Sequence, residues 1–242
     1  MSRSDGRKQD QLRPVTLVPD YVEFPEGSVL ISIGKTRVLC NVSVEENVPA
    51  WMEKPESTRG WITAEYALLP RSTSTRVRRE TGGLSGRTQE IKRIIGRSLR
   101  AAFDLDLLGK RTLIVDCDVL QADGGTRTAA ITGGYAALSI AVQKLIDLGE
   151  IPGEVFLAPV AAISVGLIDG EPALDLDYSE DARAEADLNI VMNQAGEYIE
   201  IQGTGEGATF SRDKLDLLLD FAAKGIRDLF TIQSNWRGQA GD

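Results

Sequence analysis

The chain of 242 residues contains no histidine, only two cysteines and few aromatic residues, which make up 6% of it. The absence of histidine excludes serine–histidine and cysteine–histidine nucleophiles, histidine general bases and most transition-metal sites. Any chemistry must therefore use carboxylates, lysine, arginine, hydroxyl groups, the backbone and, where a metal takes part, a hard cation.

Long apolar runs and a signal-peptide pattern are also missing. No apolar run approaches the roughly 18 residues that a membrane helix needs, and the first ten residues are polar. Cys40 and Cys117 each lie in a strand-like apolar run, which favours buried, reduced thiols over a disulfide or a metal pair. We therefore expect a soluble, cytoplasmic protein with no membrane partner.

The net charge of −9 argues at first against a nucleic-acid partner, but the charge is unevenly distributed. Residues 71–100 include nine Lys or Arg and two Glu, a balance of +7, which leaves −16 for the remainder. Such a contrast is typical of a basic surface that binds a polyanion. A basic helix face paired with the acidic remainder would give the same count.

The stretch Asp116–Ala130 predicts a phosphate site. An apolar strand runs through Asp123, Gly124 and Gly125, and a long apolar helix begins at Thr126 and Arg127. The first turn of a helix has unpaired N–H groups and the positive end of the helix dipole, so it attracts anions. Glycines let the backbone approach a ligand, and an arginine matches phosphate oxygens in pairs. A plain strand-to-helix turn with an incidental arginine is the alternative.

Apolar periodicity predicts two sets of strands, each followed by helical segments. The predicted strands are Val29–Ile33, Thr36–Val44, Trp61–Leu69, Leu113–Leu120, Val155–Ile168, Ala173–Tyr178, Leu188–Met192 and Tyr198–Gln202, and the predicted helices are Arg87–Phe103, Thr126–Leu148 and Arg212–Phe230. Arg71–Ser85 is rich in Ser, Thr, Gly and Arg and lacks an apolar period, so we expect a mobile loop. The order of elements fits an α+β fold.

Asp181 and Asp187 follow a predicted strand and are candidate metal ligands. Two carboxylates near a strand end can hold Mg²⁺, which prefers oxygen ligands. Glu180 and Glu185 stand close by, and an acidic loop is often simply solvated, so spacing alone does not choose among the four. Arg87 opens a predicted helix, where its backbone and side chain could both meet an anion.

Several separated stretches together resemble the bacterial ribonuclease PH family. They are Arg3–Arg7, Leu12–Val15, Gly60–Glu80, Gly86–Asp104, Asp116–Ala130 and Asp175–Arg212. The resemblance extends over nearly the whole chain, in order and spacing. It implies a phosphorolytic 3′→5′ exoribonuclease that trims the 3′ ends of tRNA precursors. It also implies a single domain over residues 1–242, made of two duplicated β-sheet and helix halves, with the fold of ribosomal protein S5 domain 2.

The resemblance also implies roles for individual residues. Those that match the family's phosphate-binding residues are Arg87, Gly125, Thr126 and Arg127. Asp181 and Asp187 match the acidic pair that supports catalysis and the metal ion, Mg²⁺ or Mn²⁺. The arginines that match the family's RNA contacts are Arg71, Arg76, Arg78 and Arg79. In a flexible loop without aromatic neighbours, such arginines suit contacts to backbone phosphates.

The expected reaction is attack by inorganic phosphate on the last phosphodiester of an RNA, which releases a nucleoside 5′-diphosphate. The family usually forms homohexamers, as trimers of dimers. Three other functions fit the pattern less well. A non-catalytic RNA-binding subunit would not need all of these residues, and a small-molecule kinase would need an ATP loop. A hydrolytic exonuclease generally has more acidic metal ligands and often a histidine.

Overall fold

Two β-sheets, with helices between and outside them, make up the protein, and the computed structural model describes residues 3, 5–54, 56–207 and 209–239. The strands are β1 (Val15–Pro19), β2 (Gly27–Ile33), β3 (Thr36–Glu45), β4 (Trp61–Leu68), β5 (Thr112–Gln121), β6 (Val160–Ile168), β7 (Glu171–Leu174), β8 (Ala186–Asn193) and β9 (Tyr198–Gly205). The helices are α1 (Gly86–Arg100), α2 (Thr126–Asp147), α3 (Tyr178–Asp181) and α4 (Arg212–Gln239). The strand orders are β1-β2-β3-β5-β4 and β7-β6-β8-β9.

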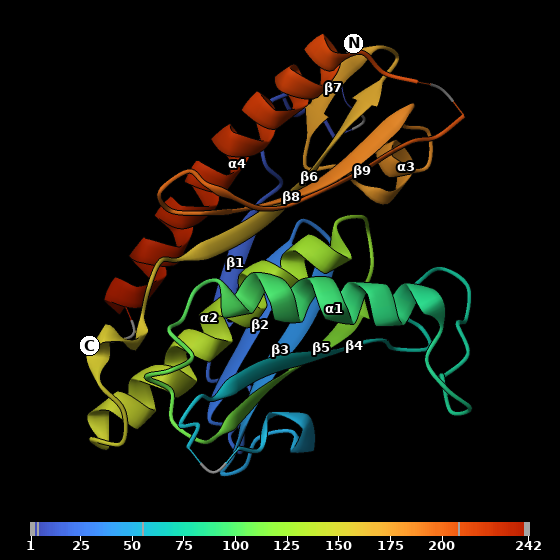
Figure 1. Cartoon of the computed structure of the whole chain (residues 1–242). Coiled ribbons are helices and arrows are strands. Elements are labelled where there is room, and N and C mark those ends of the chain that lie inside the picture. Colours follow the sequence, from blue (N-terminus) through green and yellow to red (C-terminus); the bar gives the residue numbers. More distant parts are fainter. Residues whose placement is uncertain (1–2, 4, 55, 208, 240–242) are drawn as a thin grey trace.

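Helix α2 lies between the two sheets (Figure 1), against β2 and β3 on one side and β6 on the other. Because it is covered on both sides, it is apolar nearly all round. It is also long and apolar enough to span a membrane, so the expectation that no run approaches that length was wrong. However, 78% of its apolar window is buried inside the protein, and this burial explains its composition without a membrane.

The other long helices cover one face each. Helix α1 packs beside α2 on β4 and buries Ile91, Ile95 and Leu99, while Ser85 caps its first turn by accepting a hydrogen bond from the Thr88 N–H. Helix α4 covers the outer face of the second sheet, against β6 and β7 (Figure 1). The molecule is therefore layered as sheet, helices, sheet and helix, as predicted for an α+β fold.

Several predicted boundaries were wrong. The strand predicted over Val155–Ile168 begins only at Val160, because a 3₁₀ turn occupies Gly153–Val155. The strand predicted over Ala173–Tyr178 ends at Leu174, because Asp175 has a left-handed backbone with φ 55°. Strand β1 was not predicted, and α4 continues nine residues beyond the predicted end, to Gln239.

The two cysteines lie opposite each other on β3 and β5 and are free and buried, as predicted. A hydrogen bond with Cys40 and burial both hold the pKa of the Cys117 thiol well above its usual range. The Cys117 thiol therefore stays protonated, and both cysteines act as small apolar side chains against α2.

The packing of α2 on the first sheet gives a matched pair of substitutions. A Cβ at Gly133 would lie 2.6 Å from Ile31 Cγ2, whereas one at Gly134 would lie 3.3 Å from Val115 Cγ1. We expect Gly133→Ala to destabilise the protein by about 1–3 kcal/mol through overpacking. Gly134→Ala should stay within about 1 kcal/mol of the wild type, because the gain in helix propensity offsets its milder crowding. Urea unfolding measures both, and equal stability of the two variants would contradict the packing.

Candidate active site

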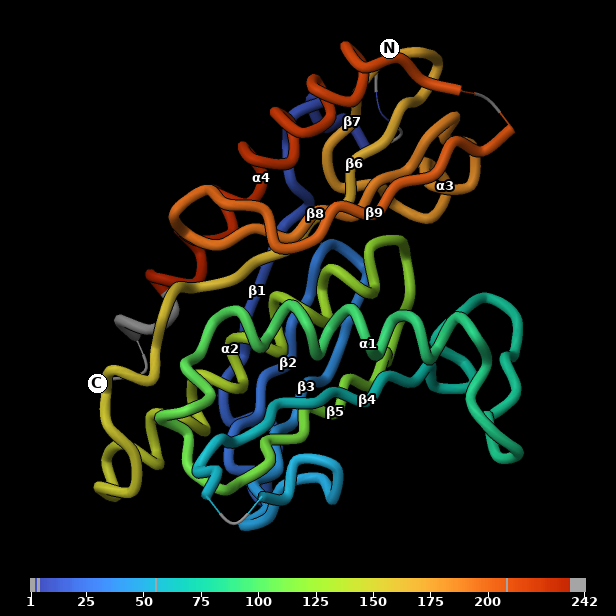
Figure 2. The backbone as a smooth tube through the Cα atoms, in the orientation of Figure 1, coloured from blue at the N-terminus to red at the C-terminus, as the bar shows by residue number. Residues whose placement is uncertain are grey.

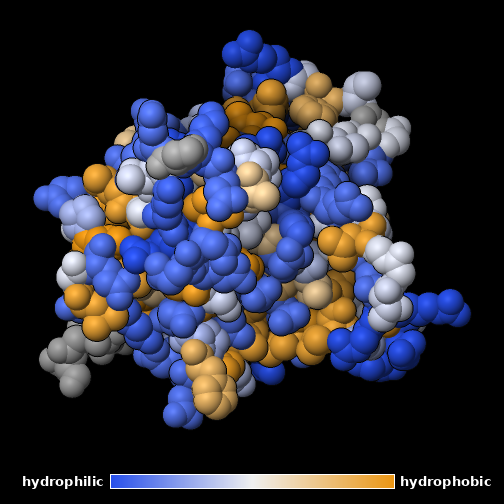
Figure 3. Space-filling model, turned by 60° about the horizontal axis from the view of Figure 1, so that its bottom comes forward, coloured by the Kyte–Doolittle hydropathy of each residue, from blue (hydrophilic) through white to orange (hydrophobic). Residues whose placement is uncertain are grey.

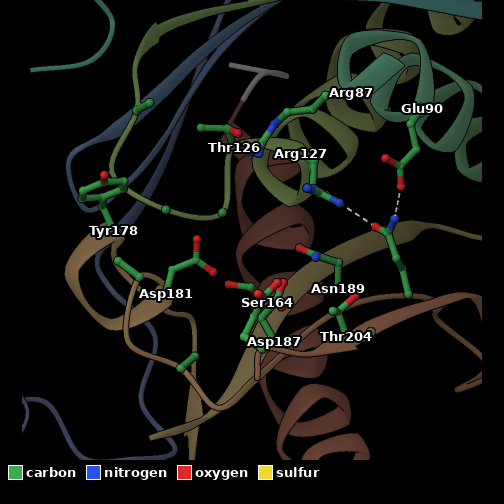
Figure 4. A pocket seen from close by; sticks show the side chains of 18 of the residues that line it. Arg87, Glu90, Thr126, Arg127, Ser164, Tyr178, Asp181, Asp187, Asn189 and Thr204 are labelled. Carbon is green, nitrogen blue, oxygen red and sulfur yellow. Dashed lines mark hydrogen bonds between the residues drawn. The ribbon is translucent and has the colours of Figure 1, made fainter. Parts of the chain in front are cut away.

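One pocket at the seam between the two halves of the chain brings together the residues singled out from the sequence. Its volume is about 580 Å³. The first half contributes residues of β4, α1 and the start of α2, and the second half contributes residues of α3, β8 and β9 (Figure 4). The residues predicted to bind phosphate or metal all line it: Arg87, Gly125, Thr126, Arg127, Asp181 and Asp187.

The start of α2 forms one wall of the pocket. Gly125 is the N-cap of this helix, with φ 65°, and no side chain caps the first turn. The first N–H groups of α2 therefore lack a side-chain acceptor at the positive end of the helix dipole. Arg87, near the start of α1, points toward Thr126 (Figure 4) and makes no hydrogen bond or ion pair within the described residues. We call this side of the pocket, formed by residues 125–127 and Arg87, the anion wall. It carries unpaired backbone N–H donors and positive charge.

The glycine turn, residues 123–125, packs directly against the chain that leads into α3. A Cβ at Gly124 would lie 2.4 Å from the Leu176 carbonyl oxygen and 2.7 Å from the Asp177 carbonyl carbon. The φ of Gly124 is 75°, which also disfavours any side chain. Only glycine at this position lets the two walls of the pocket approach each other so closely.

Two side chains outside the predicted set hold the anion wall in place. The hydroxyl groups of Tyr66 and Thr126 form a hydrogen bond of 2.8 Å. Arg127 Nη1 donates to Gln202 Oε1 at 2.6 Å, and Gln202 donates in turn to Glu90. Alternation along β4 and β9 places these residues on strands, but nothing in that pattern reveals which polar residue faces a pocket.

Asp181 and Asp187 form the opposite, carboxylate wall. Asp181 ends α3, and Asp187 lies in β8 opposite Thr204 of β9. Loss of hydration and the nearby Asp187 charge raise the pKa of Asp181, whereas Arg127 and Arg87 act in the opposite direction. The two carboxylates therefore repel each other across a small space, and a cation between them would relieve that repulsion.

The donor set of this wall fits a hard divalent cation bound together with a substrate. Besides the two carboxylates, the oxygen atoms of Ser164, Asn189 and Thr204 belong to the lining. In the described part of the chain, no group of three or more His, Cys, Asp or Glu residues could hold a metal by itself. Mg²⁺ commonly binds through one or two carboxylates, substrate phosphates and waters, so the wall suits it.

The four arginines predicted to contact RNA lie outside the pocket, in the segment between β4 and α1. They are Arg71, Arg76, Arg78 and Arg79, and all four are exposed. Within the described residues none of them forms a hydrogen bond or an ion pair. The segment projects from the right of Figure 1, and Figure 3 shows strongly hydrophilic side chains gathered on that projection.

The basic residues of α1 are in a different situation, because most of them are paired. Lys92 contacts Glu65, Arg97 contacts Glu200, and Arg100 lies over the Trp61 ring with its guanidinium carbon 4.2 Å from the ring centroid. Within the described structure, the basic residues among 71–100 therefore form two groups: those on α1, most of which are paired, and those in the loop, which are unpaired. The loop concentrates unpaired positive charge that a polyanion could contact, whereas the unpaired Arg87 of α1 lines the pocket.

The models of two protein-family domains match the chain in succession. The 3′ exoribonuclease family, domain 1, matches residues 11–143, and domain 2 of the same family matches residues 158–225. The chain belongs to the 3′ exoribonuclease family. The pocket thus takes one wall from each of the family's two domains.

Relatives in this family cover almost the whole chain. Ribonuclease PH of Corynebacterium efficiens is 57% identical over 234 residues, which are 96% of this chain and 95% of that protein. Ribonuclease PH of Syntrophomonas wolfei is 53% identical over 240 residues, 98% of this chain and 100% of that protein. These similarities confirm the resemblance to ribonuclease PH that the sequence motifs indicated.

Solved structures confirm the predicted fold class. The Archaeoglobus fulgidus exosome with RNA bound to the active site aligns with a TM-score of 0.80 at 25% identity, over 95% of this chain and 92% of that one. Rrp46 from rice aligns with a TM-score of 0.77 at 22% identity, over 96% of this chain and 98% of that one. The rice protein bears on the fold alone.

The anion wall leads to a binding prediction for this family member. Inorganic phosphate should raise the Tm of the wild type in a concentration-dependent way, because a ligand that binds only the folded state stabilises it. At a concentration about 100 times its Kd the gain is about 2.7 kcal/mol. Arg127→Ala should lose most of this gain, whereas the exposed Arg212→Ala on α4 should keep it. An Arg127→Ala variant with the full gain would contradict the assignment of this wall.

Proposed function

We propose that this 3′ exoribonuclease family member shortens RNA one nucleotide at a time from the 3′ end by phosphorolysis, with tRNA precursors as its main substrates. The observation that carries the proposal is a pocket in which an uncapped helix start and two arginines face two carboxylates. Such a pocket can hold an attacking phosphate and a scissile phosphodiester side by side.

The anion wall binds and orients inorganic phosphate. Arg87 and Arg127 neutralise its charge, and the N–H groups at Thr126 donate to its oxygens. Phosphate is already largely anionic near neutral pH, so it needs little deprotonation before it attacks. This is why a chain without histidine can perform the reaction. The main obstacle is the repulsion between two anions, which the arginines reduce.

The carboxylate wall acts on the leaving side. Asp181 and Asp187 would hold Mg²⁺ or Mn²⁺, which supplies charge neutralisation at the scissile phosphate and the departing oxygen. One of these two carboxyl groups, Asp187 or Asp181, would also assist proton transfer to the departing ribose oxygen. The products are a nucleoside 5′-diphosphate and an RNA shortened by one residue.

The reaction should also be readily reversible, because its free-energy change is small. A phosphodiester is exchanged for a diphosphate linkage, so nucleoside diphosphates should extend an RNA 3′ end. The exposed arginine loop, residues 71–79, guides the RNA through its backbone phosphates, which imposes little sequence preference.

We also propose the assembly and the setting in which this reaction takes place. The similarity to the Archaeoglobus fulgidus exosome supports an assembly of several such chains, and we propose a homohexamer made as a trimer of dimers. Residues 1–242 act as one unit, because both halves line the pocket. Two free, buried thiols suit the reducing cytoplasm.

A product assay tests the proposed reaction. The substrate is a short RNA with a single-stranded 3′ tail, incubated with Mg²⁺ in the presence and absence of phosphate. We expect nucleoside diphosphates only when phosphate is present, and at least a 100-fold loss of turnover in Asp187→Asn. Chelation of the metal by EDTA should abolish turnover in the wild type.

Other products would exclude the mechanism. Nucleoside monophosphates formed without phosphate would indicate a hydrolase. RNA binding without any product would indicate a non-catalytic subunit. Circular dichroism should show that Asp187→Asn is folded, which separates loss of chemistry from loss of structure.

The arginine loop gives a separate prediction about RNA affinity. Charge reversal of Arg76, Arg78 and Arg79 to Glu should weaken RNA binding by about tenfold or more at low salt and flatten its salt dependence. The matched control reverses Lys54, Lys110 and Arg227, which are exposed and lie outside the pocket and the loop. Filter binding over a salt series measures both, and equal losses would mean that net charge alone, rather than the loop, attracts RNA.

A further inference from the structure

A buried ion pair outside the pocket joins the two walls. Arg13 and Asp175 form two hydrogen bonds, Nη2 to Oδ1 at 2.7 Å and Nε to Oδ2 at 3.0 Å. The backbone N–H of Arg13 adds a third, to Oδ2 at 2.8 Å. Their side chains are only 4% and 1% exposed. Neither residue lines the pocket, yet both lie directly behind it.

Arg13 also reaches the glycine turn. Its Nη1 donates to the Asp123 carbonyl oxygen, and its Nη2 lies 3.5 Å from the Gly124 carbonyl oxygen. Thr36 completes this support, since its hydroxyl accepts from the Asp123 N–H and donates to the Gly124 carbonyl. One guanidinium thus contacts the turn that begins the anion wall and the carboxylate that precedes α3.

A second buried pair fixes α3 itself. Arg3 donates to both carboxylate oxygens of Glu180, at 2.8 and 2.6 Å, and its Nη1 donates to the Leu174 carbonyl oxygen at 2.6 Å. Glu180 is fully buried and is the immediate neighbour of Asp181. It also accepts the Asp177 N–H in a capping box at the start of α3. Figure 2 shows the N-terminal segment beside β7 and α4, where these contacts occur.

The backbone between the two pairs is strained. Asp175 has a φ of 55°, which is uncommon for a residue other than glycine. Its carbonyl oxygen accepts from Arg3 and Arg7, and its N–H donates to the Ser164 carbonyl at 2.7 Å. The surrounding arginines therefore hold this residue in a conformation that an isolated chain would avoid.

We propose that Arg13 and Arg3, paired with Asp175 and Glu180, form a positioning clamp that sets the separation between the anion wall and the carboxylate wall. The proposal rests on the proposed function, since it assumes that phosphate binds at Arg127. None of the four clamp residues belongs to the lining of the pocket. They act through the glycine turn on one side and through α3 on the other.

Stability alone is a weak reason for such an arrangement. Moving two charges out of water costs free energy, and the attraction between them often only just offsets that cost. A protein in which apolar residues replace a buried ion pair is often as stable as the original. A buried charge pair that bridges two walls does provide directional hydrogen bonds, which fix geometry to a fraction of an ångström. Support of this kind behind a site commonly changes affinity or activity by about 10–100-fold.

Arg13→Lys is the sharpest test of the clamp. Lysine keeps the positive charge beside Asp175 but has a single nitrogen, so it cannot also reach the Asp123 and Gly124 carbonyls. We expect the KM for phosphate to rise about tenfold, while the Kd for RNA measured without phosphate stays within about twofold of the wild type. If Arg13→Lys folds poorly, the double variant Arg13→Gln/Asp175→Asn, which removes both buried charges, should likewise raise the KM for phosphate and leave the Kd for RNA unchanged.

The matched control is Arg111→Lys. Arg111 also pairs with two carboxylates, Glu46 and Glu150, and donates to the Leu108 carbonyl, but it lies away from the pocket. It should change Tm without changing the KM for phosphate. A purely structural role of Arg13 would likewise lower Tm and leave that KM unchanged, and this result would overturn the clamp.

Arg127→Ala separates failure of the clamp from failure of the proposed function. If it raises the KM for phosphate while the Arg13 variants do not, only the clamp is wrong. If Arg127→Ala also keeps the wild-type KM, the phosphate-site assignment fails and the clamp fails with it. If Arg111→Lys raises the KM as much as Arg13→Lys does, the effect is general and the clamp is wrong.

Discussion

Gly124 packs against the backbone of Leu176 and Asp177 so closely that no side chain fits between them. This contact joins the start of α2, from the first half of the chain, to the approach to α3, from the second half. Each half therefore supplies one wall of the pocket, and neither wall is a site alone. The ion pair between Arg13 and Asp175 lies behind the contact and holds both sides of it.

The burial of α2 determines where this contact occurs. A helix packed between two sheets cannot tilt or shift without disturbing both, so its uncapped first turn stays at the seam. The same burial makes this 22-residue helix apolar nearly all round, so its length and composition resemble those of a membrane segment. One structural requirement thus explains an unusual composition and places the positive end of a helix dipole in the pocket.

Charge is organised at three levels in this acidic protein. Arg3 and Arg13 are buried and neutralised by Glu180 and Asp175, where they position the chain. Lys92 and Arg97 of α1 are paired at the surface. The arginine loop and Arg87 are unpaired within the described residues and face solvent or the pocket. Net charge therefore says little about polyanion binding here, because four of these unpaired arginines are concentrated in one loop.

Local pattern determined much of this protein. The first two predicted strands, the helical spacing of α1 and the glycine turn before Thr126 each follow from neighbouring residues. The choice of Asp181 and Asp187 among four acidic residues came instead from the family resemblance. The tertiary structure decided what depends on distant residues. Strand β7 ends at Leu174, just before Asp175, whose left-handed backbone is held by Arg13 from 162 positions earlier. Gln202 meets Arg127 across 75 positions. Such contacts leave no periodic trace, because hydrogen bonds between far segments depend on how the sheets pack.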